Sequence, residues 1–124
     1  MGWHIPSNDE WNILINFLGG SEVASGKLKE DGFNHWVYPN IADNISGFTA
    51  LPGGVELESG HFINGTNRID WYKYLGSSAR FCTKSIYSDN ITLYNIISME
   101  NTTGICSLTR NYKYASASVR CIKD

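Results

Sequence analysis

The sequence lacks an apolar run that approaches the roughly 20 residues needed to cross a bilayer as a helix, so we expect no membrane insertion of this domain. Its formal net charge is only −2 over 124 residues, and such a balance offers no basic surface for nucleic acid or for an anionic membrane. The first residues carry neither the basic start nor the apolar stretch of a secretory signal peptide. We therefore expect one domain over residues 1–124, cut from a longer chain.

Cysteine is also scarce, with three residues at wide spacings. This pattern matches neither a zinc site nor a disulfide framework. Cys121 lies on the apolar side of an alternating stretch, which predicts a buried and inert thiol. The sequence does not show whether Cys82 and Cys106 are paired, because their separation along the chain does not give the distance between their Cα atoms. They are either free thiols or a disulfide formed in an oxidising compartment.

The motifs of common catalytic sites are missing as well. No cysteine shares a short motif with histidine, no Gly-x-Ser-x-Gly turn occurs, and Pro52–Gly54 is not followed by the Gly-Lys-Ser/Thr of a phosphate loop. Asp43 with Asn44 is a candidate pair for calcium, but hard cations need about six or more oxygen ligands. We predict no catalytic residue, no cofactor and no metal, with a structural ion at Asp43 as the open alternative.

The N-terminal part of the chain predicts helices. Ser7 and Glu10 have the spacing of a capping box, and apolar residues then recur at helical spacing from Trp11 to Leu18 before two glycines. These signals predict a helix from about Ser7 to Leu18. A second, short helix is predicted to begin after Ser21 and to end before Gly26.

Residues 31–54 follow with an irregular pattern, interrupted by glycine and proline. Four aromatic residues fall within this segment: Phe33, Trp36, Tyr38 and Phe48. A long segment with so many aromatic side chains is typical of an ordered loop held by its own residues. We expect Phe48 and Leu51 to be its buried anchors.

The C-terminal half predicts antiparallel strands. Residues 79–87 and 91–98 flank a turn at 88–90 and should form a hairpin, and residues 105–110 form a further candidate strand. In residues 114–124 small apolar residues alternate with mostly polar ones, which predicts a half-buried closing strand inside the sheet. On that reading Val119 and Cys121 face the core, so Cys121→Asp should destabilise the domain strongly.

Helices followed by antiparallel strands indicate an α+β domain. Several blocks of this sequence, in order, also resemble one known family. The blocks are Gly2–Ser7 with Glu10-Trp11, Leu18–Gly20, Gly26–Glu30, His35-Trp36, Pro39-Asn40, Ser46–Phe48 with Ala50–Gly54, Gly60 with Phe62, and Ser118–Asp124.

These blocks resemble the Fibrobacter succinogenes major paralogous domain. The resemblance implies a C-type-lectin-like fold, with N-terminal helices against a twisted antiparallel sheet and long ordered loops. This fold is shared with formylglycine-generating enzymes and with the variable proteins of diversity-generating retroelements. It also implies an extracellular or cell-surface location in bacteria, or a phage or virus particle. His4 and His35 lie within the blocks, which implies structural roles, and His61 is expected in an exposed turn.

The chain departs from the family pattern between residues 71 and 118. Half of the residues from Ser77 to Ser118 are Ser, Thr, Asn or Tyr. Randomisation of adenines in Asn codons yields this composition, which suits adaptable binding, although exposed strands of undiversified domains favour Thr and Tyr as well. We predict non-enzymatic binding of an unknown protein or glycan. The alternatives are a structural or assembly domain of a surface protein, or an enzyme like the formylglycine-generating enzymes.

Binding hot spots favour Tyr, Trp and Arg. We therefore predict that tyrosines of the diverged segment share one exposed patch near the C-terminal strand, with two asparagines as adaptable polar contacts. Trp71 aligns with a family tryptophan, so a place in the core is its alternative. The predicted ligand-binding residues are Trp71, Tyr72, Tyr74, Arg80, Tyr87, Tyr94, Asn95, Asn111, Tyr112 and Tyr114.

Overall fold

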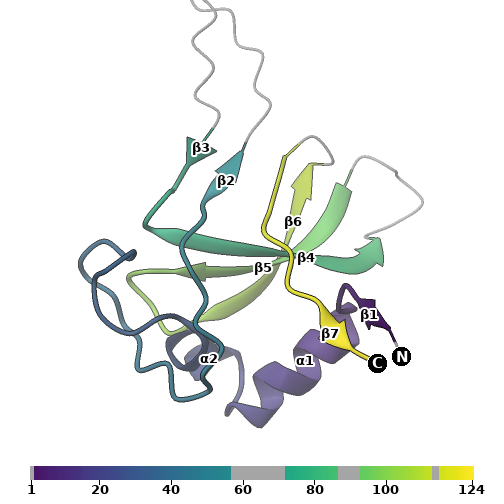
Figure 1. Cartoon of the computed structure of the whole chain (residues 1–124), viewed down its shortest axis with the longest axis horizontal. Helices are drawn as coiled ribbons and strands as arrows, with labels where there is room; N and C mark the ends of the chain where they lie inside the picture. Colours follow the sequence, from purple (N-terminus) through teal and green to yellow (C-terminus); the bar gives the residue numbers. More distant parts are fainter. Residues whose placement is uncertain (1, 57–71, 87–92, 113–114) are drawn as a thin grey trace, which may run out of the picture.

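The computed structural model describes residues 2–56, 72–86, 93–112 and 115–124 (Figure 1). In these residues two helices precede a three-stranded antiparallel sheet, and four short strands pair as β1–β7 and β2–β3. The helices are α1 (Asn8–Phe17) and α2 (Ser21–Leu28), and the strands are β1 (Trp3–His4), β2 (Val55–Glu56), β3 (Tyr72–Lys73), β4 (Ser78–Ile86), β5 (Leu93–Glu100), β6 (Cys106–Tyr112) and β7 (Ile122–Lys123). The domain is therefore a small α+β fold.

Helix α1 begins where the capping box predicts. The Glu10 backbone N–H donates to Ser7 Oγ, and the Glu10 carboxylate in return accepts from the Ser7 backbone N–H at 2.8 Å. Two groups that the first turn leaves unpaired are thereby satisfied. Gly19 and Gly20 follow the helix with positive φ angles, which a side chain disfavours, so the chain turns there.

Helix α2 is longer than predicted, because it passes through Gly26 and ends at Leu28. The Gly26 carbonyl accepts hydrogen bonds from the backbone N–H groups of Asp43 and Asn44. A Cβ at this position would lie 3.3 Å from the Ile41 carbonyl oxygen. Gly26 therefore permits close packing of the loop on the helix instead of ending the helix.

Strand β5 is the centre of the sheet and runs antiparallel to β4 and β6. Since side chains alternate between the two faces of a sheet, the pairing register assigns each row of residues to one face. The rows that contribute to the core beneath the helices are Ala79–Met99–Cys106 and Phe81–Ile97. The opposite side, termed here the outer face, carries Ser78, Arg80, Cys82, Tyr94, Ile96, Ser98, Glu100, Ser107, Thr109 and Asn111.

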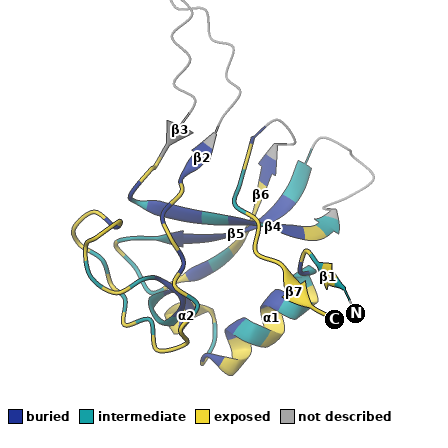
Figure 2. Cartoon of the chain, in the orientation of Figure 1, coloured by how far each residue is buried: buried dark blue, intermediate teal, exposed yellow. Residues whose placement is uncertain are grey.

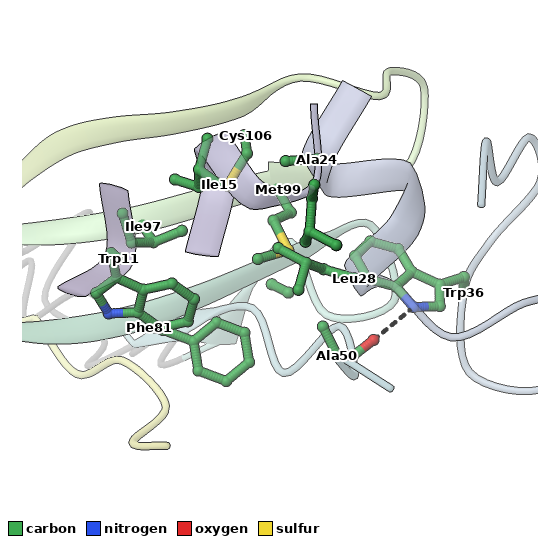
Figure 3. Close-up of a cluster of buried hydrophobic side chains, with 12 residues drawn as sticks. Trp11, Ile15, Ala24, Leu28, Trp36, Ala50, Phe81, Ile97, Met99 and Cys106 are labelled. Carbon is green, nitrogen blue, oxygen red and sulfur yellow. Dashed lines mark hydrogen bonds between the residues drawn. The ribbon is translucent and has the colours of Figure 1, made fainter. Parts of the chain in front are cut away.

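The hydrophobic core lies between the helices and the sheet (Figures 1 and 2). Trp11 on α1 packs against Phe81 on β4, with 5.9 Å between the ring centroids. Leu28 on α2 and Ile97 on β5 are fully buried in the same cluster (Figure 3). Burial of these side chains is the main force that holds helices and sheet together.

The long loop between α2 and β2 is ordered by polar contacts and by one buried tryptophan. Trp36 is 1% exposed, and its Nε1–H donates to the Ala50 carbonyl at 3.0 Å (Figure 3). The Asn40 amide donates to the carbonyls of Glu30 and Gly32, both at 2.8 Å. These bonds connect segments of the loop that are distant in sequence.

The predicted anchors of this loop are only partly correct. Phe48 is half-buried and packs against the core cluster, whereas Leu51 is exposed. Phe33 and Tyr38 are exposed too, with their rings in contact at 5.6 Å. Trp36 therefore supplies the buried contact that the prediction assigned to Phe48 and Leu51.

The prediction of a closing strand inside the sheet is wrong. Ser118 forms one parallel bridge beside Phe81 on β4, after which the chain leaves the sheet and β7 pairs with β1. Val119 is consequently 54% exposed, and Cys121 is exposed as well. Because alternation buries a side chain only where a core covers one face, Cys121→Asp should not have the large predicted cost.

Candidate ligand-binding face

One end of the outer face is closed by the segment from Ala115 to Ser118. Tyr94 Oη donates to the Ala115 carbonyl, and Cys82 Sγ lies 3.8 Å from the Ala117 carbonyl oxygen. Burial raises the pKa of Tyr94 to about 12 and also raises the pKa of the Cys82 thiol. These two side chains are thus held under the C-terminal segment.

The other end of the outer face is open and forms a depression with a volume of about 360 Å³. It lies over the part of the sheet next to the turn between β5 and β6. Its side chains are mostly hydroxyls, with one guanidinium and one carboxylate. They belong to Arg80, Ser98, Glu100, Thr103, Ile105, Ser107 and Thr109.

Arg80 is oriented by its neighbours on the same face. Its Nε–H donates to Ser78 Oγ at 3.2 Å, and its guanidinium carbon lies 5.1 Å from the centroid of the Tyr74 ring. The hydroxyls of Ser78 and Ser98 both donate to Glu100 Oε1, at 3.0 and 3.1 Å. The arginine and the carboxylate are therefore connected through Ser78, with no direct ion pair between them in the described residues.

A buried lysine holds the turn that borders this depression. Lys29 Nζ donates to the carbonyls of Glu100 and Thr103, at 2.7 and 2.9 Å, and lies 3.4 Å from that of Asn101. Burial lowers the pKa of Lys29 to about 8, and the Glu100 carboxylate opposes this shift. At pH 7 the ammonium is therefore charged and can satisfy three carbonyls of the turn.

Of the predicted binding residues, Arg80 lines this depression, and Tyr74 contacts Arg80 through its ring without lining the depression itself. Tyr74 is exposed, and Arg80 is half-buried within the wall. Three other predicted residues, Trp71, Tyr87 and Tyr114, lie outside the described residues, and Tyr72 and Tyr112 are described only as backbone in β3 and β6.

The prediction for Asn95 and Asn111 is wrong as to their accessibility, because both are buried. Asn95 lies on the helix side of β5 and donates from its amide to the Ser85 carbonyl at 3.0 Å. Asn111 is near Tyr94 on the closed end of the outer face. Tyr94 itself is half-buried, so among the predicted binding tyrosines whose side chains are described, Tyr74 is exposed and Tyr94 is not.

Sequence reasoning missed Ser98, Glu100, Thr103, Ser107 and Thr109. A signal for two of them was present, because Ser107 and Thr109 alternate with Cys106 and Leu108 in the predicted third strand. The alternation places both hydroxyls on one face, although it does not tell which face the helices cover.

His4, on β1, is hydrogen-bonded both to helix α1 and to the segment after β7. Its Nδ1 lies 2.7 Å from Asp124 Oδ1, its Nε2 lies 2.8 Å from Glu10 Oε1, and Ser7 Oγ donates to Glu10 Oε2. The order differs from a Ser-His-Asp triad, since a carboxylate separates the serine from the histidine. Hydrogen bonds first to Asp124 and then to Glu10 raise the pKa of His4. Both ring nitrogens of His4 have carboxylate partners, and the group of His4, Glu10 and Asp124, termed here the clasp, therefore has a structural role.

The clasp predicts a pH dependence of stability. The Ser7 backbone N–H and then His4 lower the pKa of Glu10 from 4.5 to about 2. Its contribution is therefore present above about pH 4.5 and is lost as the pH falls towards 2. The His4 contribution has the opposite sign, being complete below 6.5 and lost as the pH rises through its raised pKa. Chemical denaturation should show the largest stability difference between the native chain and Glu10→Gln from pH 4.5 to 6.5.

Glutamine is a matched replacement here because it still serves the capping box. Asp9→Asn, on the exposed side of the same helical turn, is the control for loss of one carboxylate. A stability difference for Glu10→Gln that stays constant from pH 2 to pH 9 would contradict the clasp.

The remaining candidates for chemistry have structural partners. His35 Nδ1 pairs with Glu30 at 2.9 Å, while His61 lies outside the described residues. Asp43 Oδ1 accepts from the Ile45 backbone N–H, and no cluster of three or more His, Cys, Asp or Glu is found in the described part of the chain. All three cysteines are free thiols, and burial raises the pKa of Cys106 to about 12. No described helix is long and apolar enough to span a membrane.

Together, the fold and this depression define a small α+β domain whose sheet is covered by helices on one face and partly open on the other. The model of the Fibrobacter succinogenes major domain matches residues 1–123, so the chain belongs to that family. This confirms the resemblance found in the sequence. Comparison with curated proteins gave no match, and comparison with solved structures gave none either.

Proposed function

We propose that this domain is a non-enzymatic ligand-binding module that uses the open end of its outer face. The observation that carries the proposal is the depression of about 360 Å³ in which Arg80 lies among hydroxyl groups. Concave sites of this size with a few converging polar groups are typical of ligand binding. The hydroxyls of Ser107 and Thr109 have no hydrogen-bond partner among the described residues, so they are free to contact a ligand.

The scaffold is proposed to be C-type-lectin-like, on the surface of a bacterial cell or of a phage particle. Support comes from the order of elements, with helices first and an antiparallel sheet afterwards, and from the pairing of the two ends of the chain in β1 and β7. The family membership adds to this support. Fold likeness does not transfer an enzymatic activity, and the thiols Cys82 and Cys106 both have raised pKa values that disfavour thiolate chemistry.

A more specific form of the proposal is that the domain is a variable protein of a diversity-generating retroelement. Ser107 and Thr109 belong to the segment that is half Ser, Thr, Asn and Tyr, and both face the open depression. Diversification at such positions changes the ligand contacts and leaves the helix side of the sheet intact. The genomic sequence tests this form directly: a near-copy repeat of the coding segment beside a reverse transcriptase supports it, and their absence contradicts it.

Arrays of glycans and of peptides test the binding function with the purified domain. Thr109→Trp fills the depression from an exposed position on β6, and Asn12→Trp adds the same ring to the exposed side of α1 as its control. We expect every specific array signal of the native domain to survive in Asn12→Trp and to disappear in Thr109→Trp, with equal melting temperatures. Signals that persist in Thr109→Trp would contradict the outer face as the binding site, and complete absence of binding would favour an assembly role.

A further inference from the structure

Arg80 has guanidinium N–H groups that can donate hydrogen bonds to a ligand. A guanidinium carries five N–H groups in a planar fork, and within the described part of the chain only the Nε–H of Arg80 has a hydrogen-bond partner, Ser78 Oγ. The Tyr74 ring supports the plane of the group at 5.1 Å. Such an arginine is pre-organised, because little side-chain freedom remains to be lost on binding. Its terminal nitrogens match two oxygens of a planar carboxylate.

Glu100, the second charged residue that lines the depression, disfavours ligands with more than one negative charge. Glu100 uses Oε1 to accept from Ser78 and Ser98, whereas Oε2 has no hydrogen-bond partner in the described residues. With one guanidinium and one carboxylate in the wall, the site as a whole is nearly neutral. A dianion such as phosphate would be repelled by Glu100, so a single carboxylate is the better match for Arg80.

Hydroxyl groups complete the site on the adjacent strands. Arg80 pairs with Ser98, and Ser98 pairs with Ser107, so two strand spacings of about 5 Å each separate Arg80 from Ser107. A ligand in this gap meets Arg80 on one side and the free hydroxyls of Ser107 and Thr109 on the other. The volume of about 360 Å³ lies at the lower end of the range for ligand sites, which is enough for a single sugar-sized ring.

From these features we infer that the open end of the outer face binds an acidic sugar, a hexuronate unit of a glycan. Its carboxylate binds the Arg80 fork, and its ring hydroxyls bind Ser107, Thr109 and Glu100 Oε2. An acidic peptide segment fits less well, since it does not offer a ring of hydroxyl groups close to its carboxylate for Ser107, Thr109 and Glu100 Oε2. The inference rests on the proposed binding function and names the ligand class of the same site.

Nuclear magnetic resonance titration with simple sugars tests the inference. The probes are methyl galacturonide and methyl glucuronide, with methyl galactoside and methyl glucoside as neutral counterparts of the same rings. We expect the uronides to shift backbone resonances of β4, β5 and β6 around the depression, and the neutral sugars to bind at least about ten-fold more weakly, since a charge-assisted pair is lost. Arg80→Gln should weaken uronide binding by roughly ten- to a hundred-fold.

Two further variants separate charge from geometry. Arg80→Lys keeps the charge but loses the fork, so it should also weaken uronide binding. Lys84→Gln removes one positive charge from an exposed position on the same strand and should leave binding unchanged. Equal binding of neutral sugars, or full binding by Arg80→Gln, would overturn the inference. Tighter binding of a glutamate-rich peptide than of the uronides would assign the site to acidic peptides instead.

The outcome is distinguishable from failure of the proposed function. If no uronide binds while array ligands are still lost in Thr109→Trp, the ligand class is wrong and the binding site stands. If Thr109→Trp binds the array ligands as well as the native domain does, the proposed binding site itself is wrong.

Discussion

Replacement of Lys29 by methionine is expected to lower the free energy of unfolding by about 3–5 kcal/mol, because two short hydrogen bonds from a charged donor, worth roughly 1.5–3 kcal/mol each, are lost. Lys29 is 0% exposed, and its ammonium serves the carbonyls of Glu100, Asn101 and Thr103 while lying 5.2 Å from the Trp36 ring centroid. Methionine fills a similar volume but donates no hydrogen bond. The carbonyls of Glu100 and Thr103 would then lose this donor, whereas the Asn101 carbonyl would keep the Ile41 backbone N–H.

Urea denaturation at pH 7 measures this effect, with Lys84→Met as a control for loss of an exposed lysine from β4. The control should change stability by less than about 0.5 kcal/mol. Because Glu100 and Thr103 line the depression, Lys29→Met should also weaken ligand binding under conditions in which the variant remains folded. A stability close to that of the native chain would show that water can replace the ammonium.

Replacement of Trp36 by alanine is expected to cost about 3–5 kcal/mol, the range for removal of a large aromatic ring from a core. Trp36 is buried among core side chains, and the change also removes one of the two donors to the Ala50 carbonyl, which keeps the Glu30 backbone N–H. The cavity would open between the long loop and α2, where Leu28 packs (Figure 3). Thermal and urea unfolding of the same variant give two independent measurements.

The same loop provides graded controls. Phe48 is half-buried, so Phe48→Ala should cost less than Trp36→Ala, and Leu51 is exposed, so Leu51→Ala should change stability by less than about 0.5 kcal/mol. If Leu51→Ala proved as damaging as Trp36→Ala, the loop would be held by contacts other than those described. The order Trp36, Phe48, Leu51 is thus the expected ranking.

Local signals in the sequence predicted several elements well. Helix α1 was predicted from Ser7, Glu10 and the apolar spacing, because a capping box and an amphipathic stripe act within a few turns of one segment. Strands β4, β5 and β6 were predicted from their composition and the turns between them. These elements need little information from the rest of the chain.

Predictions failed where a distant segment decides the outcome. The second helix was predicted to end before Gly26, yet α2 continues to Leu28, because the loop at Ile41 packs against Gly26. The alternation around Val119 predicted a half-buried strand, yet Val119 and Cys121 lie beyond the sheet, where no core covers them. No role was predicted for Lys29 from the sequence, and the turn between β5 and β6 surrounds it with carbonyls.

By itself, the sequence determined the α+β class, the first helix, the antiparallel pair β4–β5 and the family to which the chain belongs. Each of these depends on spacing and composition within short segments. Only the tertiary structure decided which end of the outer face is closed by Ala115–Ser118, and therefore that Tyr94 and Asn111 are covered while Arg80 is open. The physical reason is that the accessibility of a strand residue depends on which segment from elsewhere in the sequence packs over it. The alternation of residues within the strand does not reveal that segment.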